Sequence, residues 1–437
     1  RLVGSEMCIR DRIKNVLSIK ADATARLGNR ETEQWDSDMN IPYKQGPNLA
    51  DEYLGWVDMA QLAKERDYYT SVNAYIDFTK SFGKHQVSAL AGFNQEYNSH
   101  RYMRGEREEL ISSSLPSVEL ATGSARVRED NYEWATRGGF FRLNYIYNNK
   151  YIFEANGRYD GSSRFAKGNR WGFFPSASLG WNIYREKFME PAADFLSNLK
   201  LRVSYGLLGN QADAGLYTFA SNMSLNGGLG GYIFSDGRHI YTNPAPVIDP
   251  NTTWEKVESK NIGLDFGFFG NALTGTVDIF QRDTKDMLGP GLEFPDMFGA
   301  VAPQANNARM RNRGWELSLN YRGKIGNDID YSVGGSVSDA VSEVTEYANA
   351  KKNDPYGSWY TGRKVGEIWG YRAEGLIQTQ EEADAYNAEY DLSYISGKLW
   401  EPGDVKYIDL DGNKVIDRGD NSCLLYTSPS PRDGATS

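Results

Sequence analysis

Residues Gly314–Val337 read GWELSLNYRGKIGNDIDYSVGGSV and contain two stretches in which apolar and polar side chains alternate. The apolar members are Trp315, Leu317, Leu319 and Tyr321 in the first stretch, and Ile329, Tyr331, Val333 and Val337 in the second. A period of two is typical of a β-strand with one apolar and one polar face. Gly326-Asn327 lies between the stretches and predicts a short turn.

The same alternation recurs along the chain and predicts eleven strands, most of them about ten residues long. These strands are Ile13–Ala25, Thr70–Thr79, Gln86–Tyr97, Gly139–Asn148, Lys150–Asp160, Phe173–Tyr184, Asn198–Leu207, Lys260–Gly270, Ala272–Arg282, Gly314–Arg322 and Gly326–Val337. We therefore expect an all-β protein.

Short and long connections alternate between the predicted strands. The long connections are Arg26–Tyr68, Asn98–Arg137, Gly161–Gly172, Leu208–Ser259 and Asp283–Arg313. In an up-and-down antiparallel sheet alternate connections lie at the same edge, so all short turns share one edge and all long loops the other. This is the plan of a transmembrane β-barrel with short periplasmic turns and long external loops. A soluble sandwich or propeller is the alternative fold.

Composition limits the class of protein further. No stretch of about 20 apolar residues predicts a transmembrane helix. The net charge of −10 argues against nucleic acid as a partner. The mean hydropathy of −0.59 remains compatible with a barrel, because half of each strand faces a polar lumen and the long loops face water. Many of the aromatic residues lie near the predicted strand ends, where Tyr and Trp favour the membrane interface.

The two ends and the last third of the chain depart from the alternating pattern. Residues 1–12 (RLVGSEMCIRDR) and 423–437 (CLLYTSPSPRDGATS) resemble translated sequencing-adapter read-through, and we expect both to be non-native tails. Residues 13–340 are the predicted barrel strands and loops. Residues 341–422 are predicted to be a long external loop segment, with a capping box at Thr379 and Glu382 that begins a short helix through Tyr386.

Residues Arg158–Trp181 read RYDGSSRFAKGNRWGFFPSASLGW, and this stretch closely resembles the most recognisable segment of SusC-like (SusC/RagA) TonB-dependent outer-membrane transporters. Four more segments resemble the family in the same order. They are LKLRVSYGLLGNQ (199–211), TTWEKVESKNIGLDFGFFGNALTGTVDIFQRDTKDML (252–288), RNRGWELSLNYRGKIG (311–326) and EIWGYRAEGLIQTQEEADAY (367–386), which PGDVKYIDLDGNKVID (402–417) follows. Together they cover most of the interior of the chain.

The resemblance implies a plugged barrel of roughly 22 strands, of which this chain would hold about half as an internal fragment. It also implies location in the cell outer membrane, in contact with its lipid, and TonB-dependent active import of oligosaccharides or peptides. A SusD-type lipoprotein would cover the external loops, and the TonB complex would pull on the plug. We expect the plug and the TonB-contacting segment to lie outside this fragment.

Aromatic side chains in the long loops are candidate contacts for substrate or partner, because a flat ring can cover the apolar face of a sugar. The candidates are Trp35, Trp56, Tyr217, Tyr232, Phe234, Tyr241, Trp359 and Tyr360. The alternative is that these rings pack the loops onto one another or face the lid.

The segment Asp409–Asp420 reads DLDGNKVIDRGD and partly matches a calcium-binding loop. Its candidate ligands are Asp409, Asp411, Asn413, Val415 through its carbonyl, Asp417 and Asp420. Lys414 stands where the pattern has Gly, and Asp420 is shorter than the usual Glu. Ca²⁺ is therefore an optional cofactor of this loop, and an Asx-rich turn is the alternative.

The sequence contains no catalytic constellation. His85, His100 and His239 lack metal-ligand or triad spacing, and no nucleophile elbow or Walker loop is present. We therefore do not expect an enzyme. Two alternatives to glycan import remain open, namely a TonB-dependent siderophore or cobalamin receptor, and a surface binding or adhesion β-protein without transport.

Overall fold

The computed structural model describes residues 2–13, 16–36, 39–43, 52–56, 58–212, 214–221, 223, 225–226, 233–234, 237–238, 241–242, 245–291, 294–326, 328–348, 358–395 and 398–425. For 2–13, 39–43, 52–56, 225–226, 233–234, 237–238, 241, 296, 421 and 424–425 it describes the backbone alone. By its internal contacts the chain divides into two compact units. No helix in the described part of the chain is long and apolar enough to cross a membrane.

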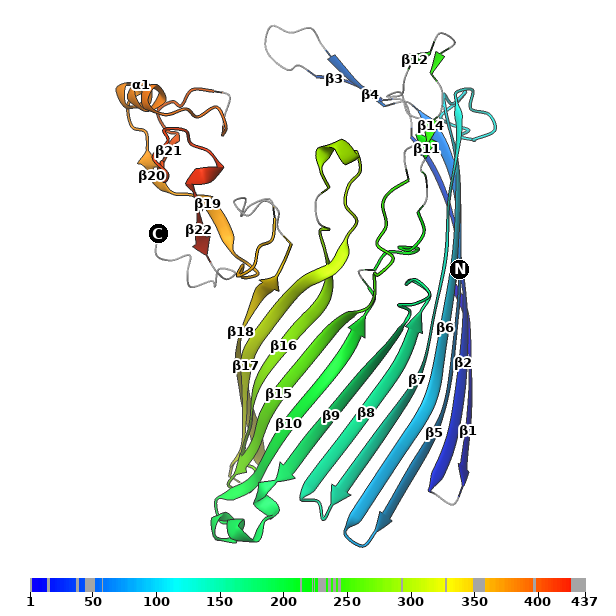
Figure 1. The fold of residues 1–437 in the computed structure, drawn as a ribbon, viewed down its shortest axis with the longest axis vertical. Coiled ribbons are helices and arrows are strands. Elements are labelled where there is room, and N and C mark those ends of the chain that lie inside the picture. The colour runs from blue at the N-terminus through cyan, green and yellow to red at the C-terminus, as the bar shows by residue number, and fades with distance from the viewer. Residues whose placement is uncertain are drawn as a thin grey trace. The chain divides into compact units, whose positions relative to one another are not determined.

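The first unit comprises Arg1–Trp181, Gln211–Ala220 and Pro250–Trp254. Its sheet is antiparallel, and each long strand pairs with the next in chain order. The strands are β1 (Leu2–Ile13), β2 (Leu17–Asp36), β5 (Met59–Phe82), β6 (His85–Glu108), β7 (Ala125–Tyr147), β8 (Tyr151–Ser162) and β9 (Trp171–Asn182), all labelled in Figure 1. The short strands β3 (Met39–Tyr43) and β4 (Glu52–Trp56) pair with each other in the connection between β2 and β5.

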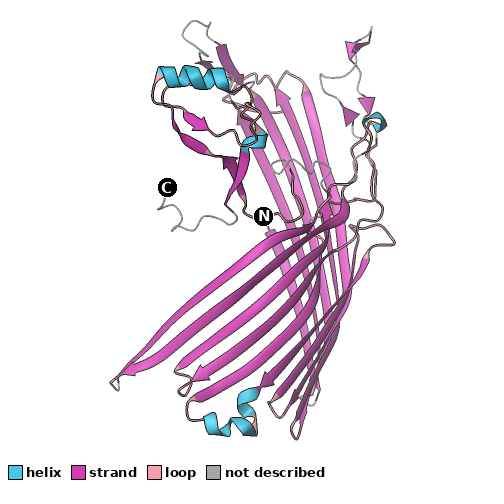
Figure 2. Cartoon of the chain, turned by 60° about the vertical axis from the view of Figure 1, so that its left-hand side comes forward, coloured by secondary structure: helices cyan, strands magenta, loops and turns pink. Residues whose placement is uncertain are grey.

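The second unit comprises Asn182–Asn210, Ser221–Asp249 and Glu255–Ser437. Its long strands also pair in chain order: β10 (Leu196–Asn210), β15 (Glu255–Phe268), β16 (Leu273–Gly289), β17 (Ala305–Ile325) and β18 (Ile329–Glu346). The short elements are η1 (Ile183–Arg185), η2 (Lys187–Ala192), β11 (Leu225–Asn226), β12 (Ile233–Phe234), β13 (Gly237–Arg238), β14 (Tyr241–Thr242) and η3 (Asp296–Phe298). Strands dominate the chain, as the magenta ribbon in Figure 2 shows.

The predicted short turns are confirmed, and their backbone explains the residues found there. Gly83 adopts φ +57° in the turn between β5 and β6, and Gly270 adopts φ +65° in the turn between β15 and β16. Asn148 and Asn149, with φ 49° and 54°, make the turn between β7 and β8. Gly and Asn tolerate this left-handed region better than other residues.

The predicted strand length of about ten residues is wrong. Strands β5 and β6 have 24 residues each, and they pair without interruption from Met59 opposite Glu108 to Phe82 opposite His85. Beyond the apolar part of each strand both faces carry polar side chains, so the hydropathy pattern disappears. The backbone hydrogen bonds continue there, because pairing depends on backbone groups rather than on hydropathy.

Residues 2–12, which we expected to be non-native, form β1 together with Ile13, and β1 pairs along its length with β2, with Leu2 opposite Gly28 and Ile13 opposite Leu17. Cys423 lies in β22 (Asn421–Leu425), opposite Trp369. These pairings show where the two segments lie in the structure. The adapter origin of residues 1–12 and 423–437 stays a prediction.

The segment after β18 has its own small core. It contains β19 (Ile368–Tyr371), β20 (Ala373–Leu376), α1 (Gln380–Glu389), β21 (Val405–Tyr407) and η4 (Arg418–Asp420), with β19 paired to β22 and β20 to β21. Ile377, Ala383, Tyr386, Leu392 and Ile416 are buried together. The predicted helix start at Thr379 is confirmed, since its side chain accepts a hydrogen bond from the Glu382 amide.

Candidate functional site

The polar face of the second unit carries a charged cluster that spans three strands. Arg202 on β10 donates two hydrogen bonds to Asp265 on β15 through Nε and Nη2, at 3.0 and 2.8 Å. Its Nη2 also donates to Asp278 on β16 at 3.0 Å, and Asn261 donates to the other oxygen of Asp278 at 2.8 Å. One guanidinium therefore binds two carboxylates, an arrangement stronger and more directional than a single neutral hydrogen bond.

Gly263 makes room for this cluster. Arg202 and Gly263 are direct cross-strand neighbours, and so are Gly263 and Asp278. A Cβ at position 263 would lie 2.6 Å from Nη2 of Arg202, closer than carbon and nitrogen can approach. The guanidinium can cross β15 because the strand has no side chain at this point.

The first unit has a second polar network on the corresponding face of its sheet. Glu154 on β8 accepts hydrogen bonds from Asn144 at 3.2 Å and Asn156 at 2.9 Å. Asn156 in turn accepts from Nε of Arg142 at 2.8 Å. Arg142 and Asn144 on β7 are the cross-strand neighbours of Asn156 and Glu154 on β8, so all four lie on one face of the sheet. The result is a hydrogen-bonded wall suited to line an aqueous path.

The opposite face is apolar and ends in aromatic pairs. Tyr147 stacks on Tyr151 near the short-turn edge of the first unit, with ring centroids 6.4 Å apart. Eight residues further along β8, Tyr159 stacks on Trp171 at 5.0 Å. Large apolar side chains between these pairs are exposed, for example Leu179 at 58%. Such exposure is costly in water but normal for a lipid-facing band with aromatic girdles.

The stretch that carried the family resemblance folds into an anchor for the long loops of the first unit. Phe165, between β8 and β9, is fully buried and lies 5.3 Å from the ring of Trp254. Phe174 meets the same indole edge-on at 5.4 Å. The Trp254 indole N–H donates to the carbonyl oxygen of Arg170 at 2.8 Å. The aromatic cluster thus holds the β8–β9 loop against the segment that leads into β15.

Polar contacts extend this anchor to the segment 211–220. Arg164 donates through Nη1 to the carbonyl oxygen of Ala214 at 2.8 Å, and Thr218 donates through its hydroxyl to the carbonyl of Arg164 at 3.1 Å. Ser163 accepts a hydrogen bond from the Ala135 amide on β7 at 2.9 Å. Sequence reasoning did not single out Phe165, Arg164 or Trp254, although all three lie inside the motifs that carried the resemblance.

Two of the predicted contact aromatics form hydrogen bonds within the protein through their hydroxyl groups. The Tyr217 hydroxyl accepts from the Glu133 amide at 2.9 Å and lies 3.2 Å from the Glu133 carbonyl, so it fixes the loop to β7. Tyr360 donates to Glu367 at 2.7 Å. Burial and the neighbouring Glu367 carboxylate raise the pKa of Tyr360 to about 12. Tyr217 is nevertheless 41% exposed, so contact of these two residues with substrate or partner stays a prediction.

The other predicted aromatics lie in three different situations. Trp359 is 41% exposed, and the Arg363 guanidinium lies 4.8 Å above its ring. The prediction that Trp35 belongs to a loop is wrong, because β2 continues to Asp36, and its register opposite Ala60 places it on the apolar face. The backbones of Trp56, Phe234 and Tyr241 lie in short strands, but their side chains and all of Tyr232 are outside the described residues.

The predicted calcium loop brings three of its six candidate ligands together. Oxygen atoms of Asp409, Asp411 and Asp420 lie within 4.8 Å of one another, and Asp420 is fully buried. Lys414 adopts φ +64°, so it takes the left-handed conformation that the pattern assigns to Gly. Asp417 lies in the same loop outside this group of three carboxylates, and the Asn413 side-chain amide donates to Asp411 at 3.0 Å.

Backbone amides of the loop already donate hydrogen bonds to several of the carboxylate oxygens that a cation would use. Asp409 accepts from the amides of Gly412 at 2.7 Å and Lys414 at 2.9 Å, and Asp420 accepts from the Leu410 amide at 2.7 Å. Burial raises the pKa of the Asp409 carboxyl, but the two amide hydrogen bonds outweigh it and the net pKa is lowered. The carboxylate stays ionised, and a cation would share it with the backbone.

Comparisons with known proteins agree with this architecture. The family described as TonB-dependent receptor-like, beta-barrel, matches residues 15–417. TonB-dependent receptor SusC of Bacteroides thetaiotaomicron is 30% identical over 413 residues, which are 93% of this chain and 38% of SusC. TonB-dependent receptor P3 of Formosa agariphila is 27% identical over 374 residues, which are 81% of this chain and 35% of P3.

The fold is also similar to that of a solved structure. The RagAB peptide importer in its closed-closed state matches with a TM-score of 0.73 at 22% identity, over 98% of this chain and 44% of that chain. The chain thus spans less than half the length of each of these three proteins.

Proposed function

The chain belongs to the TonB-dependent receptor-like β-barrel family of the outer membrane, and from this premise we propose that the complete protein actively imports oligosaccharides or peptides. The TonB complex would supply the energy through a plug domain, and a SusD-type lipoprotein would cover the external loops. The observation that carries the proposal is the 30% identity to SusC over 93% of the chain.

The polar face supports import of polar solutes. Arginine, carboxylate and amide groups alternate there, as in the Arg202–Asp265–Asp278 cluster, so neither sign of charge dominates. A wall of this kind favours a neutral or zwitterionic solute over a strongly charged chelate. The name of the RagAB peptide importer adds peptides to the proposed substrates beside oligosaccharides.

Uptake in the native bacterium tests the proposal. A strain lacking the complete gene should lose uptake of a labelled oligosaccharide or peptide pool, and the wild-type gene should restore it. A gene without the TonB-contacting segment, produced at the same level in the outer membrane, should fail to restore uptake. Restoration by that truncated gene would exclude TonB-dependent import, and loss of ferric-chelate or cobalamin uptake alone would indicate the siderophore or cobalamin receptor instead.

We also propose that the loop Asp409–Asp420 binds Ca²⁺ through Asp409, Asp411 and Asp420. The grouping of their oxygens within 4.8 Å supports this, because like charges so close together gain from a shared cation. Calcium should slow hydrogen exchange of the loop in the complete protein, and Asp411→Ala should abolish the effect. Equal hydrogen-exchange rates of the wild-type loop with calcium and with chelator would contradict calcium binding.

A further inference from the structure

The apolar face of the second unit ends at a row of polar and cationic residues. Tyr205, Lys260, Gln281 and Arg313 are successive cross-strand neighbours on β10, β15, β16 and β17. The next row toward the short turns is apolar and consists of Val203, Ile262, Ile279 and Trp315. The change from apolar to cationic side chains takes place within two residues on β15 and β17.

This row lies where the outer edge of the lipid-facing band is expected. From Lys260 to Phe268 strand β15 advances about 27 Å at about 3.4 Å per residue. At a strand tilt of about 40° that distance corresponds to about 21 Å across the membrane, close to the height of about 25 Å typical of such bands. Tyr205 and Trp315 mark this edge, since such rings favour the interface.

A hollow of about 810 Å³ lies across the boundary. Its apolar lining includes Val203, Ile262, Ile279, Trp315 and Val341, and its polar lining includes Lys260, Arg313 and Asp339. Ile262 and Ile279 are 57% and 62% exposed, so the apolar floor is open to an external ligand. The hollow therefore combines an apolar surface with two cations, Lys260 and Arg313, and one carboxylate, Asp339.

The charge of Arg313 is not neutralised within the described part of the chain. Its Nε donates to Oε1 of Gln281 at 3.0 Å, and no described carboxylate forms an ion pair with it. Lys260 pairs with Glu258 at 3.0 Å, but Glu258 is also bound by Lys285, so Lys260 shares its carboxylate. Lys260 and Arg313 thus lie beside the apolar surface of the hollow, and both can still bind an external anion.

We propose that this hollow binds a phosphate-bearing lipid of the outer leaflet, with an acyl chain along Ile262 and Ile279 and the phosphate between Lys260 and Arg313. Two strand spacings separate these residues, about 10 Å between their Cα atoms, which long side chains can bridge through one phosphate. The inference rests on the outer-membrane location of the family and is independent of the proposed import.

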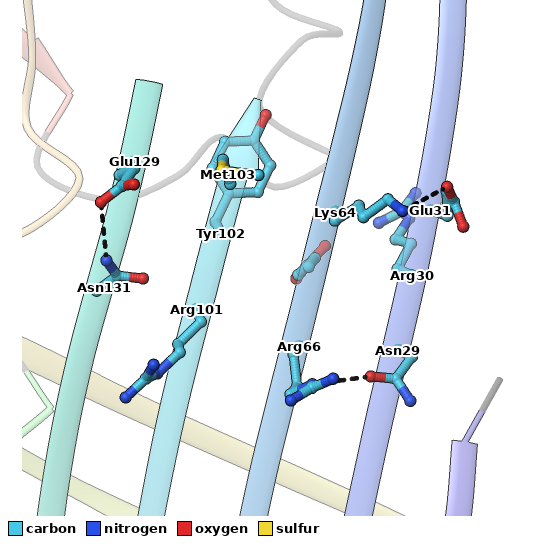
Figure 3. Close-up of a pocket in the computed structure, with 11 residues that line it drawn as sticks. Asn29, Arg30, Glu31, Lys64, Arg66, Arg101, Tyr102, Met103, Glu129 and Asn131 are labelled. Carbon is cyan, nitrogen blue, oxygen red and sulfur yellow. Dashed lines mark hydrogen bonds and ion pairs between the residues drawn. The ribbon is translucent and has the colours of Figure 1, made fainter. Parts of the chain in front are cut away.

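The first unit repeats the arrangement of cations beyond an aromatic edge. Arg66 on β5 lies directly opposite Arg101 on β6, two residues beyond Tyr68 on the same face. Figure 3 shows the two guanidinium groups directed away from each other, with Arg66 bonded to Asn29 at 3.4 Å. The pairing places two cations next to each other beyond the aromatic edge.

The test measures the lipid retained by the complete protein after purification from outer membranes in mild detergent, by native mass spectrometry. Lys260→Glu/Arg313→Glu should lower the affinity for a phosphorylated glycolipid at least about 30-fold, since each basic residue near an anionic surface contributes about 1 kcal/mol, or about fivefold. Lys324→Glu reverses the charge of one exposed lysine near the short turns and is the matched control for Arg313→Glu alone; it should retain the lipid. Unchanged retention in the double variant would overturn the proposal.

Two further binding measurements distinguish this proposal from other ligands of the same surface. The dephosphorylated glycolipid should bind the wild type as weakly as the phosphorylated one binds the double variant, and equal binding of both glycolipids by the wild type would overturn the role of the phosphate. Free inorganic phosphate should not compete at millimolar concentration; full competition would indicate a simple anion site.

A change of oligomeric state in the double variant without loss of lipid would assign the surface to a second copy and overturn the proposal. If the double variant does not fold, Arg313→Gln should show a smaller loss in the same direction.

Discussion

The ring of Phe165 lies 5.3 Å from the ring of Trp254, centroid to centroid, although the two residues are far apart in the sequence. Phe165 has no solvent exposure and Trp254 is 6% exposed. A buried contact of this kind between loop segments is the exception on a protein whose sheet exposes most of its large apolar side chains. The external loops of the first unit therefore have a core separate from the sheet.

Phe165→Ala should release the β8–β9 loop without unfolding the barrel. Removal of a buried Phe side chain costs about 3–5 kcal/mol where the cavity cannot collapse. The loop should become sensitive to protease between residues 163 and 170, while the barrel keeps its resistance to unfolding by detergent at room temperature. Trp254→Phe keeps a ring but loses the hydrogen bond to Arg170, so it should give a weaker effect. Equal protease resistance of Phe165→Ala and wild type would refute the anchor.

Gly263→Ala should destabilise the sheet of the second unit. The new methyl group would collide with the Arg202 guanidinium and force it away from Asp265 or Asp278. We expect a loss of about 1–3 kcal/mol, the usual cost of inserting a group into a packed site. Gly335→Ala on β18 is the matched control, because a Cβ there meets nothing within 4 Å. The midpoints of heat-induced unfolding in detergent should fall for Gly263→Ala only, and a similar midpoint for both variants would contradict the packing argument.

The sequence was sufficient to predict the fold class. The alternation in Gly314–Val337 reflects a real difference between two faces, because one faces lipid and the other a polar lumen. The barrel, its outer-membrane location and the SusC-like family are confirmed. The ends of the strands could not be predicted, since above the lipid band both faces of β5 and β6 meet water and the period-two signal vanishes.

The candidate site was predicted less well, for physical reasons. The sequence alone does not distinguish Tyr217 from Trp359, since both are aromatic residues in long connections. Their roles depend on partners that are distant in the chain, such as Glu133 for the Tyr217 hydroxyl. The anchor residue Phe165 precedes Trp254 by a long stretch, and no local pattern predicts their contact. Helix capping at Thr379 was predictable at the level of a single residue, because capping is a local interaction.

Thr379→Ala should weaken the first turn of α1. The Thr379 hydroxyl oxygen accepts from the Glu382 amide at 3.2 Å, and alanine leaves that amide without its partner. The expected cost is about 1 kcal/mol, or about a fivefold faster hydrogen exchange of the amides that open with this turn. Thr379→Ser is the control, because serine supplies the same oxygen and should restore wild-type exchange. Exchange unchanged in Thr379→Ala would show that the cap contributes nothing.

Glu382 should make the stability of this helix dependent on pH. Its carboxylate accepts hydrogen bonds from the Gln378 amide at 2.8 Å and from Lys406 at 2.8 Å, and these contacts lower its pKa. Because the folded pKa lies below the unfolded value, the stabilisation is fully present above the unfolded pKa of about 4.3 and is lost as pH falls through the folded pKa. Glu382→Gln keeps the shape of the side chain but cannot titrate. The protection of Gln380–Glu389 from hydrogen exchange, corrected for the intrinsic rate, should fall below about pH 4.5 in the wild type and fall less in the variant. Parallel pH profiles for the two proteins would assign the acid sensitivity to other carboxylates.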